Sequence, residues 1–216
     1  MLQIESVGEP FVESSEDTKL ALRLVWRASM MGLLDHLHGP QKLDRSLFAD
    51  LLSAMIDSRV GTEPALEALA FSSPRKSRRR AAAAHALTDL LRELNQALQD
   101  SPRPESEWGK VREFLDEDVL ADLLNISSAS VRRYAAGDRR TPDDTAWRLH
   151  LIAQLISDLI GSYNNYGIRR WFERPRTQLD GRTPREVIRG AGSEDDAEVM
   201  RISELASALA GSQLAA

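Results

Sequence analysis

The arginines of this chain gather in three stretches that could contact an anionic polymer. Four arginines lie within 127–140 against one acid, seven lie within 168–189 against three acids, and residues 75–80 read RKSRRR. A guanidinium group carries five N–H donors in a fixed fork, which pairs with phosphate oxygens or with guanine O6 and N7. Because the whole chain has a net charge of −5, this clustering predicts a localised anionic partner. Only four of the 28 basic residues are lysine, a bias that suits bidentate contacts but that a GC-rich genome would also produce.

The segment 117–142, EDVLADLLNISSASVRRYAAGDRRTP, has the pattern of a helix-turn-helix unit. Ala121 is small enough to let a second helix cross the first closely, and Asn125 tolerates left-handed backbone at the turn. Val131 and Tyr134 lie one turn apart and would bury the second helix. A serine at 127 or 128 would cap its start. The alternative is an ordinary helical hairpin with solvated arginines.

In a DNA complex, the outward side of this second helix would reach base edges in the major groove with Ser128, Ala129, Arg132 and Arg133. Two further arginines, Arg139 and Arg140, would contact phosphates and position the unit. The third cluster lies at the start of a predicted helix, where basic charge opposes the helix dipole. An external phosphate partner is therefore expected for Arg75, Lys76, Arg78, Arg79 and Arg80, and a solvated loop is the alternative.

Apolar residues at helical spacing predict an all-α fold. The expected helices cover 19–37, 45–56, 64–70, 77–98, the two helices of the helix-turn-helix unit, 141–159, 168–174, 183–190 and 194–210. Leucines at every second position from 20 to 24 would also permit a short strand. Trp147 is expected in the core. The prolines of the segment 101–104 predict a linker, so we expect a helical N-terminal extension over 1–100, a helix-turn-helix region over 105–162 and a small helical C-terminal domain over 163–216.

The run RRWFERPRTQLDGRTPREVI at 169–188, with an Xre-like helix-turn-helix before it and an acidic helix after it, resembles the toxin-binding domain of Xre/MbcA/ParS-type antitoxins. The resemblance lies in Trp171, Phe172, the LDGRTP element at 179–184, Val187 and Ile188, and it spans about residues 112–211. About 105 residues that typical members lack precede this region.

This resemblance implies an all-helical, dimeric antitoxin that represses its own operon. It also implies a RES-domain toxin, an NAD-destroying enzyme, as the partner of the C-terminal helices. The residues that inherit this partner-binding expectation are Trp171, Arg174, Arg176, Arg182 and Arg185, although the core is the favoured position of Trp171. Two alternatives stay open: a stand-alone DNA-binding regulator or architectural, nucleoid-type protein without a toxin, and an interaction module whose helix-turn-helix is vestigial.

Other function classes find no support in the residues. The chain has no cysteine, so disulfides, thiolate metal sites and cysteine nucleophiles are excluded. Its four histidines lack metal-ligand spacing, and no nucleophile, base and orienting group form a recognisable set. We therefore expect no enzyme activity, cofactor or metal. Without a run of 18 apolar residues or a basic, apolar leader, we expect a cytoplasmic bacterial protein without membrane contact, associated with the nucleoid if it binds DNA.

Overall fold

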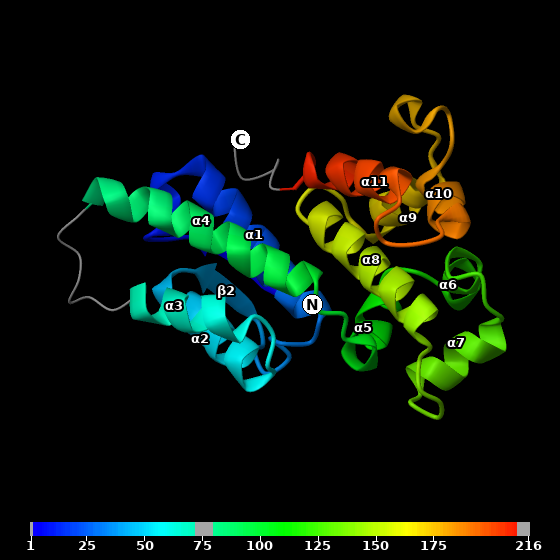
Figure 1. Ribbon diagram of the computed structural model, residues 1–216, viewed down its shortest axis with the longest axis horizontal. Coiled ribbons are helices and arrows are strands. Elements are labelled where there is room, and N and C mark those ends of the chain that lie inside the picture. Colours follow the sequence, from blue (N-terminus) through cyan, green and yellow to red (C-terminus); the bar gives the residue numbers. More distant parts are fainter. Residues whose placement is uncertain (1, 72–79, 211–216) are drawn as a thin grey trace. The chain divides into compact units, whose positions relative to one another are not determined.

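The computed structural model describes residues 2–71 and 80–210, with residues 71 and 80–85 described by their backbone alone (Figure 1). The part of the chain that the structure describes is mostly helical, with 64% helix and 5% strand, which confirms the all-α class. The chain divides into two compact units, Met1–Ser101 and Pro102–Ala216. The ranges 105–162 and 163–216 both belong to the second unit. No helix in the described ranges is long and apolar enough to span a membrane.

The first unit combines helices with one pair of short strands. Its described elements are β1 (Gln3–Val7), η1 (Phe11–Glu13), α1 (Ser15–Met30), β2 (Pro40–Leu43), α2 (Arg45–Asp57), α3 (Thr62–Phe71) and α4 (Arg80–Gln99). The strand alternative for residues 20–24 is wrong, since they lie within α1. This helix ends before the predicted position because Gly32 takes a positive φ of 74° and the N–H of Leu33 turns back to the carbonyl of Ala28.

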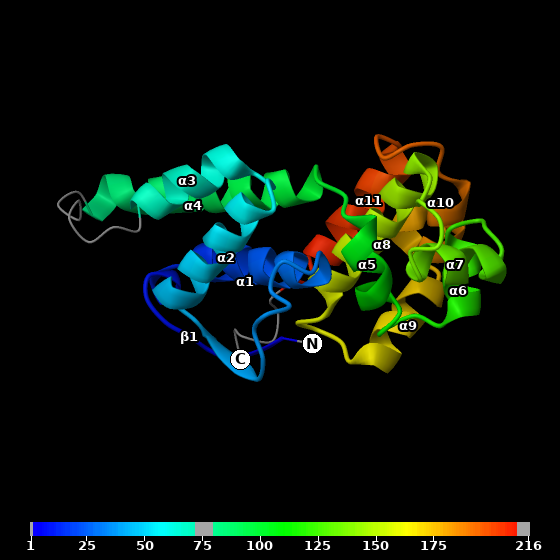
Figure 2. The ribbon, with the colours of Figure 1, turned by 90° about the horizontal axis from the view of Figure 1, so that it is seen from below.

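The strands β1 and β2 were not predicted from the sequence. They pair in parallel, with Gln3 opposite Pro40 and Val7 opposite Leu43, so the connection between them includes all of α1 (Figure 2). The core beside them is apolar, and Phe11 meets Phe48 edge to face with ring centroids 5.2 Å apart.

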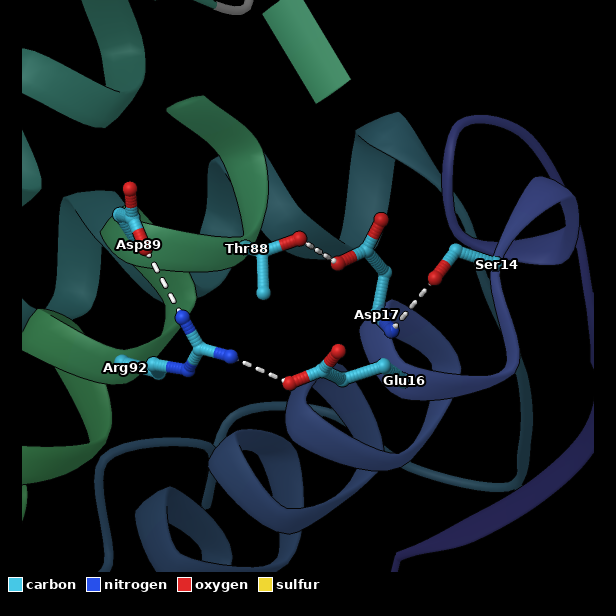
Figure 3. Close-up of polar contacts among 6 residues, drawn as sticks. All are labelled: Ser14, Glu16, Asp17, Thr88, Asp89 and Arg92. Atoms are coloured by element: carbon cyan, nitrogen blue, oxygen red, sulfur yellow. Dashed lines mark hydrogen bonds and ion pairs between the residues drawn. The ribbon is translucent and has the colours of Figure 1, made fainter. Parts of the chain in front are cut away.

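A polar seam joins α1 to α4, which lie side by side in the first unit (Figure 3). Thr88 donates a 2.6 Å hydrogen bond to the buried carboxylate of Asp17, whose backbone N–H is capped by Ser14. Arg92 bridges Glu16 on α1 and Asp89 on its own helix at 2.5 and 2.9 Å. Because a buried carboxylate needs donors to offset its lost hydration, the Thr88 hydroxyl specifies how these two helices align.

Helices are the only regular elements among the described residues of the second unit. Its elements are α5 (Pro104–Val111), α6 (Glu117–Leu123), α7 (Ser128–Ala135), α8 (Asp143–Leu159), α9 (Asn165–Glu173), η3 (Thr177–Leu179), α10 (Pro184–Gly190) and α11 (Ala197–Ser207). The central helix is α8, which packs against α5 and α11. The prediction that Trp147 lies in the core is wrong, because its side chain is only half-buried. Its indole N–H donates to Asp144 at 3.3 Å, and the guanidinium of Arg148 lies over its ring.

Candidate nucleic-acid interface

The helices α6 and α7 pack against each other across the short turn that the sequence predicted. At the end of α6 the N–H of Ile126 bonds the carbonyl of Ala121 at 2.9 Å, and Asn125 takes the left-handed φ of 53°. The hydroxyl of Ser127 then accepts the N–H of Ser130 and caps α7. Local residue chemistry therefore fixes the start of α7 in the way expected for a helix-turn-helix unit.

Two buried side chains of α7 determine which side of this helix faces outward. Val131 is fully buried, and Tyr134 is 8% exposed. The ring of Tyr134 stacks on Trp108 of α5 with centroids 6.1 Å apart, and the indole N–H of Trp108 donates to Thr141 at 2.9 Å. With this face anchored inside the unit, the opposite face of α7 is exposed to solvent.

The predicted base-reading residues lie on that outward side, and most of them have partners within the chain. Arg132 bonds Glu117 at 2.5 Å, while Arg133 donates from Nε to the carbonyl of Ala129 at 3.3 Å. Ser128 donates to Asp118 at 3.0 Å. Both arginines and Ala129 are exposed, whereas Ser128 is half-buried. The predicted arginines are therefore accessible, and two of the four candidate residues are held by acids of α6.

The acids on this surface were not recognised as part of it in the sequence. Glu117 and Asp118 lie in the first turn of α6, where acids favour the helix dipole. Their pairing with α7 depends on how the two helices pack, which spacing along one helix does not reveal. Because phosphates avoid nearby carboxylates, these two acids disfavour a phosphate contact at the start of α6.

The loop after α7 presents the second predicted pair of arginines. Gly137 takes a φ of 75° and ends α7. The guanidinium of Arg139 lies 5.9 Å from the centre of the Tyr134 ring, and Arg140 is 3.3 Å from Asp143. Both arginines border an open cavity of about 640 Å³. Glu105 and Asp143 border the same cavity, and both arginines are exposed to solvent.

The third basic cluster falls mostly outside the described residues. Arg75, Lys76, Arg78 and Arg79 lie in the range 72–79. Arg80 is the first residue of α4, and its side chain is not described either. The expected phosphate contact of this cluster stays a prediction.

The residues that the antitoxin resemblance assigned to a partner are mostly engaged within the second unit. Trp171 is 2% exposed and lies in the core, with the guanidinium of Arg176 5.3 Å from its ring centre. Arg182 forms a two-armed pair with Glu198 of α11. Only Arg174 is exposed without a hydrogen bond or ion pair to another described residue. Trp171 therefore offers no surface to a partner.

Arg185 connects α10 to α6. Its Nε donates to Asp122 of α6 at 2.6 Å, and Arg189 approaches the other oxygen of the same carboxylate at 3.2 Å. The hydrogen bond from Arg185, together with the positive charges of Arg185 and Arg189, lowers the pKa of Asp122 below its ordinary value. The carboxylate of Asp122 thus fastens the C-terminal helices to α6.

Two local features define the start of α10. Gly181 has a φ of 81° in the turn before α10, and Asp180 beside it is left-handed as well. Thr183 and Glu186 form a capping box, with Pro184 at the first position of α10. The hydrogen bonds from the backbone and side chain of Thr183 lower the pKa of Glu186.

No group of three or more potential metal ligands occurs among the described residues. Sequence reasoning missed one buried titratable pair, in which Glu107 Oε1 and His150 Nδ1 are 2.5 Å apart. Gln154 approaches the other ring nitrogen of His150 at 2.6 Å. Because Glu107 is fully buried and His150 is 5% exposed, a substrate could not reach either group, and the pair joins α5 to α8.

Comparison with family models, with curated proteins and with solved structures gives no match for this chain.

Proposed function

We propose that the chain binds double-stranded DNA through α7 and the loop that follows it, as an antitoxin-like transcriptional regulator of its own operator. The observation that carries this proposal is the division of α7, where Val131 and Tyr134 are buried while Arg132 and Arg133 are exposed on the opposite side. A helix presented in this way can enter a major groove and pair arginine with guanine. In this proposal Arg139 and Arg140 contact phosphates beside it.

The proposed protein partner is a RES-type toxin bound by the C-terminal helices. The sequence resemblance at 169–188 supports it, and the exposed guanidinium of Arg174 is available to such a partner. Co-purification of the native protein, followed by mass spectrometry and nucleic-acid analysis, tests both partners at once. A neighbouring gene for a RES-type enzyme would favour the toxin; its absence, together with a preparation that holds DNA alone, would contradict it.

A second candidate function is a stand-alone DNA-binding regulator or architectural protein. The observation that favours it is the internal use of the expected partner residues, since Trp171 is buried and Arg182 and Arg185 pair with acids of the same unit. Both candidates require DNA, and both place the protein in the bacterial cytoplasm on the nucleoid. We propose a homodimer for either function, because helix-turn-helix proteins commonly read paired half-sites.

Replacing Arg132 by alanine tests the DNA proposal directly. We expect Arg132→Ala to weaken binding to a duplex selected from a random pool by about 1–3 kcal/mol and to relax specificity. Arg112→Ala is the matched control, because Arg112 is an exposed arginine beyond α5. If Arg132→Ala lost the same amount of affinity for selected and for random duplexes, Arg132 would contact only phosphate.

The dependence of wild-type affinity on salt tests whether phosphates are contacted at all. We expect the logarithm of the association constant to fall by about 0.9 per neutralised phosphate for each logarithmic unit of salt. A flat dependence would contradict both DNA functions and leave an interaction module with a vestigial helix-turn-helix.

A further inference from the structure

The ion pair between α6 and α7 involves the residue with the strongest base-reading potential. Arg132 lies on the outward face of α7 with 62% of its side chain exposed, whereas Glu117 is 26% exposed. Their 2.5 Å contact uses a single guanidinium nitrogen, Nη1. The carboxylate therefore restrains the arginine from one side while most of its side chain stays open to solvent.

The remaining donors of Arg132 match one base edge. Nε and Nη2 carry parallel N–H groups on the other edge of the guanidinium plane, and neither is hydrogen-bonded to a described residue. Guanine presents two acceptors, O6 and N7, at the spacing of such a fork. A carboxylate on Nη1 thus leaves free the fork that a guanine needs.

We propose that Glu117 is a positioning residue that holds Arg132 for bidentate recognition of a guanine; this proposal rests on the proposed function. An arginine held by an acid has already lost part of its rotamer freedom before DNA binds, so less entropy is lost on recognition. The negative charge of Glu117 also repels phosphates on every duplex. Glu117 therefore increases discrimination between sequences while it lowers affinity for DNA in general.

The neighbouring contacts on α7 show how the other candidates use their donors. Arg133 donates from Nε to the Ala129 carbonyl, so its side fork is partly occupied by its own backbone. Its two Nη groups remain available to a phosphate or to a base edge. Asp118 holds Ser128 as Glu117 holds Arg132, so the first turn of α6 supports two positions of the reading face.

The test compares Glu117→Gln and Glu117→Asp with the wild-type chain on a selected duplex and on random duplex. Glu117→Gln removes the charge, whereas Glu117→Asp keeps the charge and shortens its reach. We expect both to lower the ratio of selected to random affinity by about tenfold, and only Glu117→Gln to raise random affinity. Glu194→Gln, in the exposed loop before α11, is the charge-matched control and should leave the ratio unchanged.

A modified base gives a readout that a merely structural role would not move. Replacing each guanine of the selected duplex in turn by 7-deazaguanine removes the N7 acceptor. We expect the replacement of one guanine in each half-site to weaken wild-type binding by about tenfold and to leave the binding of Glu117→Asp and Arg132→Ala unchanged. Circular dichroism spectra of the variants should match that of the wild type.

Each other outcome has a definite meaning. If Glu117→Gln raises selected and random affinity by the same factor, or if Glu117→Asp keeps the ratio, Glu117 is only a repelling charge and the inference is overturned. If the wild-type chain itself binds no duplex, the proposed function fails, which is a different result from salt-dependent binding with an unchanged ratio.

Discussion

A residue with left-handed backbone lies just before α7, and another lies just after it. Asn125 precedes the helix with a φ of 53°, and Gly137 follows it with a φ of 75°. L-residues with a Cβ pay about 1–2 kcal/mol for this conformation, a cost that asparagine lowers through its short polar side chain. The angle at which α7 leaves α6 is therefore specified by a residue outside both helices.

Substitutions at Asn125 test this account. Asn125 is exposed, so replacing it removes no core contact. We expect Asn125→Ala to lower the free energy of unfolding by about 1 kcal/mol, because alanine resists positive φ, and Asn125→Gly to leave it unchanged or higher. Urea denaturation followed by circular dichroism measures both. Equal losses for the two variants would mean that the side chain of Asn125, and not its backbone, stabilises the turn.

Local signals were predictable from the sequence at this scale. Asp44 and Ser127 cap their helices, and Thr183 with Glu186 forms a capping box. Each of these features depends on residues within four positions of one another. The pairs Glu117–Arg132 and Glu107–His150 are 15 and 43 positions apart, and spacing within one helix does not say which acid meets which base.

Among the elements, α10 is connected to α6 by charge. Asp122 accepts from Arg185 and lies near Arg189, and the hydrogen bond from Arg185 is the largest cause of its lowered pKa. A carboxylate whose pKa is lower in the folded state stabilises the fold at pH values above its unfolded pKa. That stabilisation is lost as the pH falls through the folded pKa.

The free energy of unfolding of the second unit should therefore depend on pH through the titration of Asp122. We expect Asp122→Asn to lower the free energy of unfolding at neutral pH and to flatten its decline below about pH 4. Asp195→Asn, in the exposed loop before α11, is the control and should keep the wild-type pH dependence. An identical decline in wild type and Asp122→Asn, measured by urea denaturation at several pH values, would contradict the role of this pair.

The strands show what helical periodicity cannot reveal. QIESV and PQKL are short, and the second begins with a proline. Neither segment carries a long alternation of apolar and polar residues, and their parallel pairing spans the whole of α1. The helices were predictable because each repeats its own apolar pattern. Each of the strands β1 and β2 instead forms only by pairing with the other, which lies far away in the sequence.

At the scale of the molecule, the chain has two compact units, so we expect a substitution in one unit to change the stability of that unit alone. Gly61 in the first unit has a φ of 55°, and a Cβ there would lie 2.6 Å from the Cβ of Ala97. We expect Gly61→Ala to destabilise the first unit by about 1–3 kcal/mol, as measured by thermal unfolding. Affinity of the folded protein for duplex DNA should stay at the wild-type value.

Gly109→Ala is the matched glycine replacement in the second unit. Gly109 lies on α5, and a Cβ there would meet no atom within 4 Å. We expect this variant to gain about 0.5–1 kcal/mol of stability, because alanine favours a helix over glycine. If Gly61→Ala abolished DNA binding by folded protein, a local change in the first unit would alter the proposed interface on α7, and the separation of effects would be wrong.

The length of α7 limits what a single copy of the proposed reading head can distinguish. Its eight residues extend about 12 Å, which matches the rise of about four base pairs. So short a DNA sequence recurs by chance throughout any genome, where the competing sites number about a million or more. A unique binding site would then require two such sequences at a fixed separation. The distance between paired copies of α7 would therefore contribute as much to sequence selection as the arginines themselves.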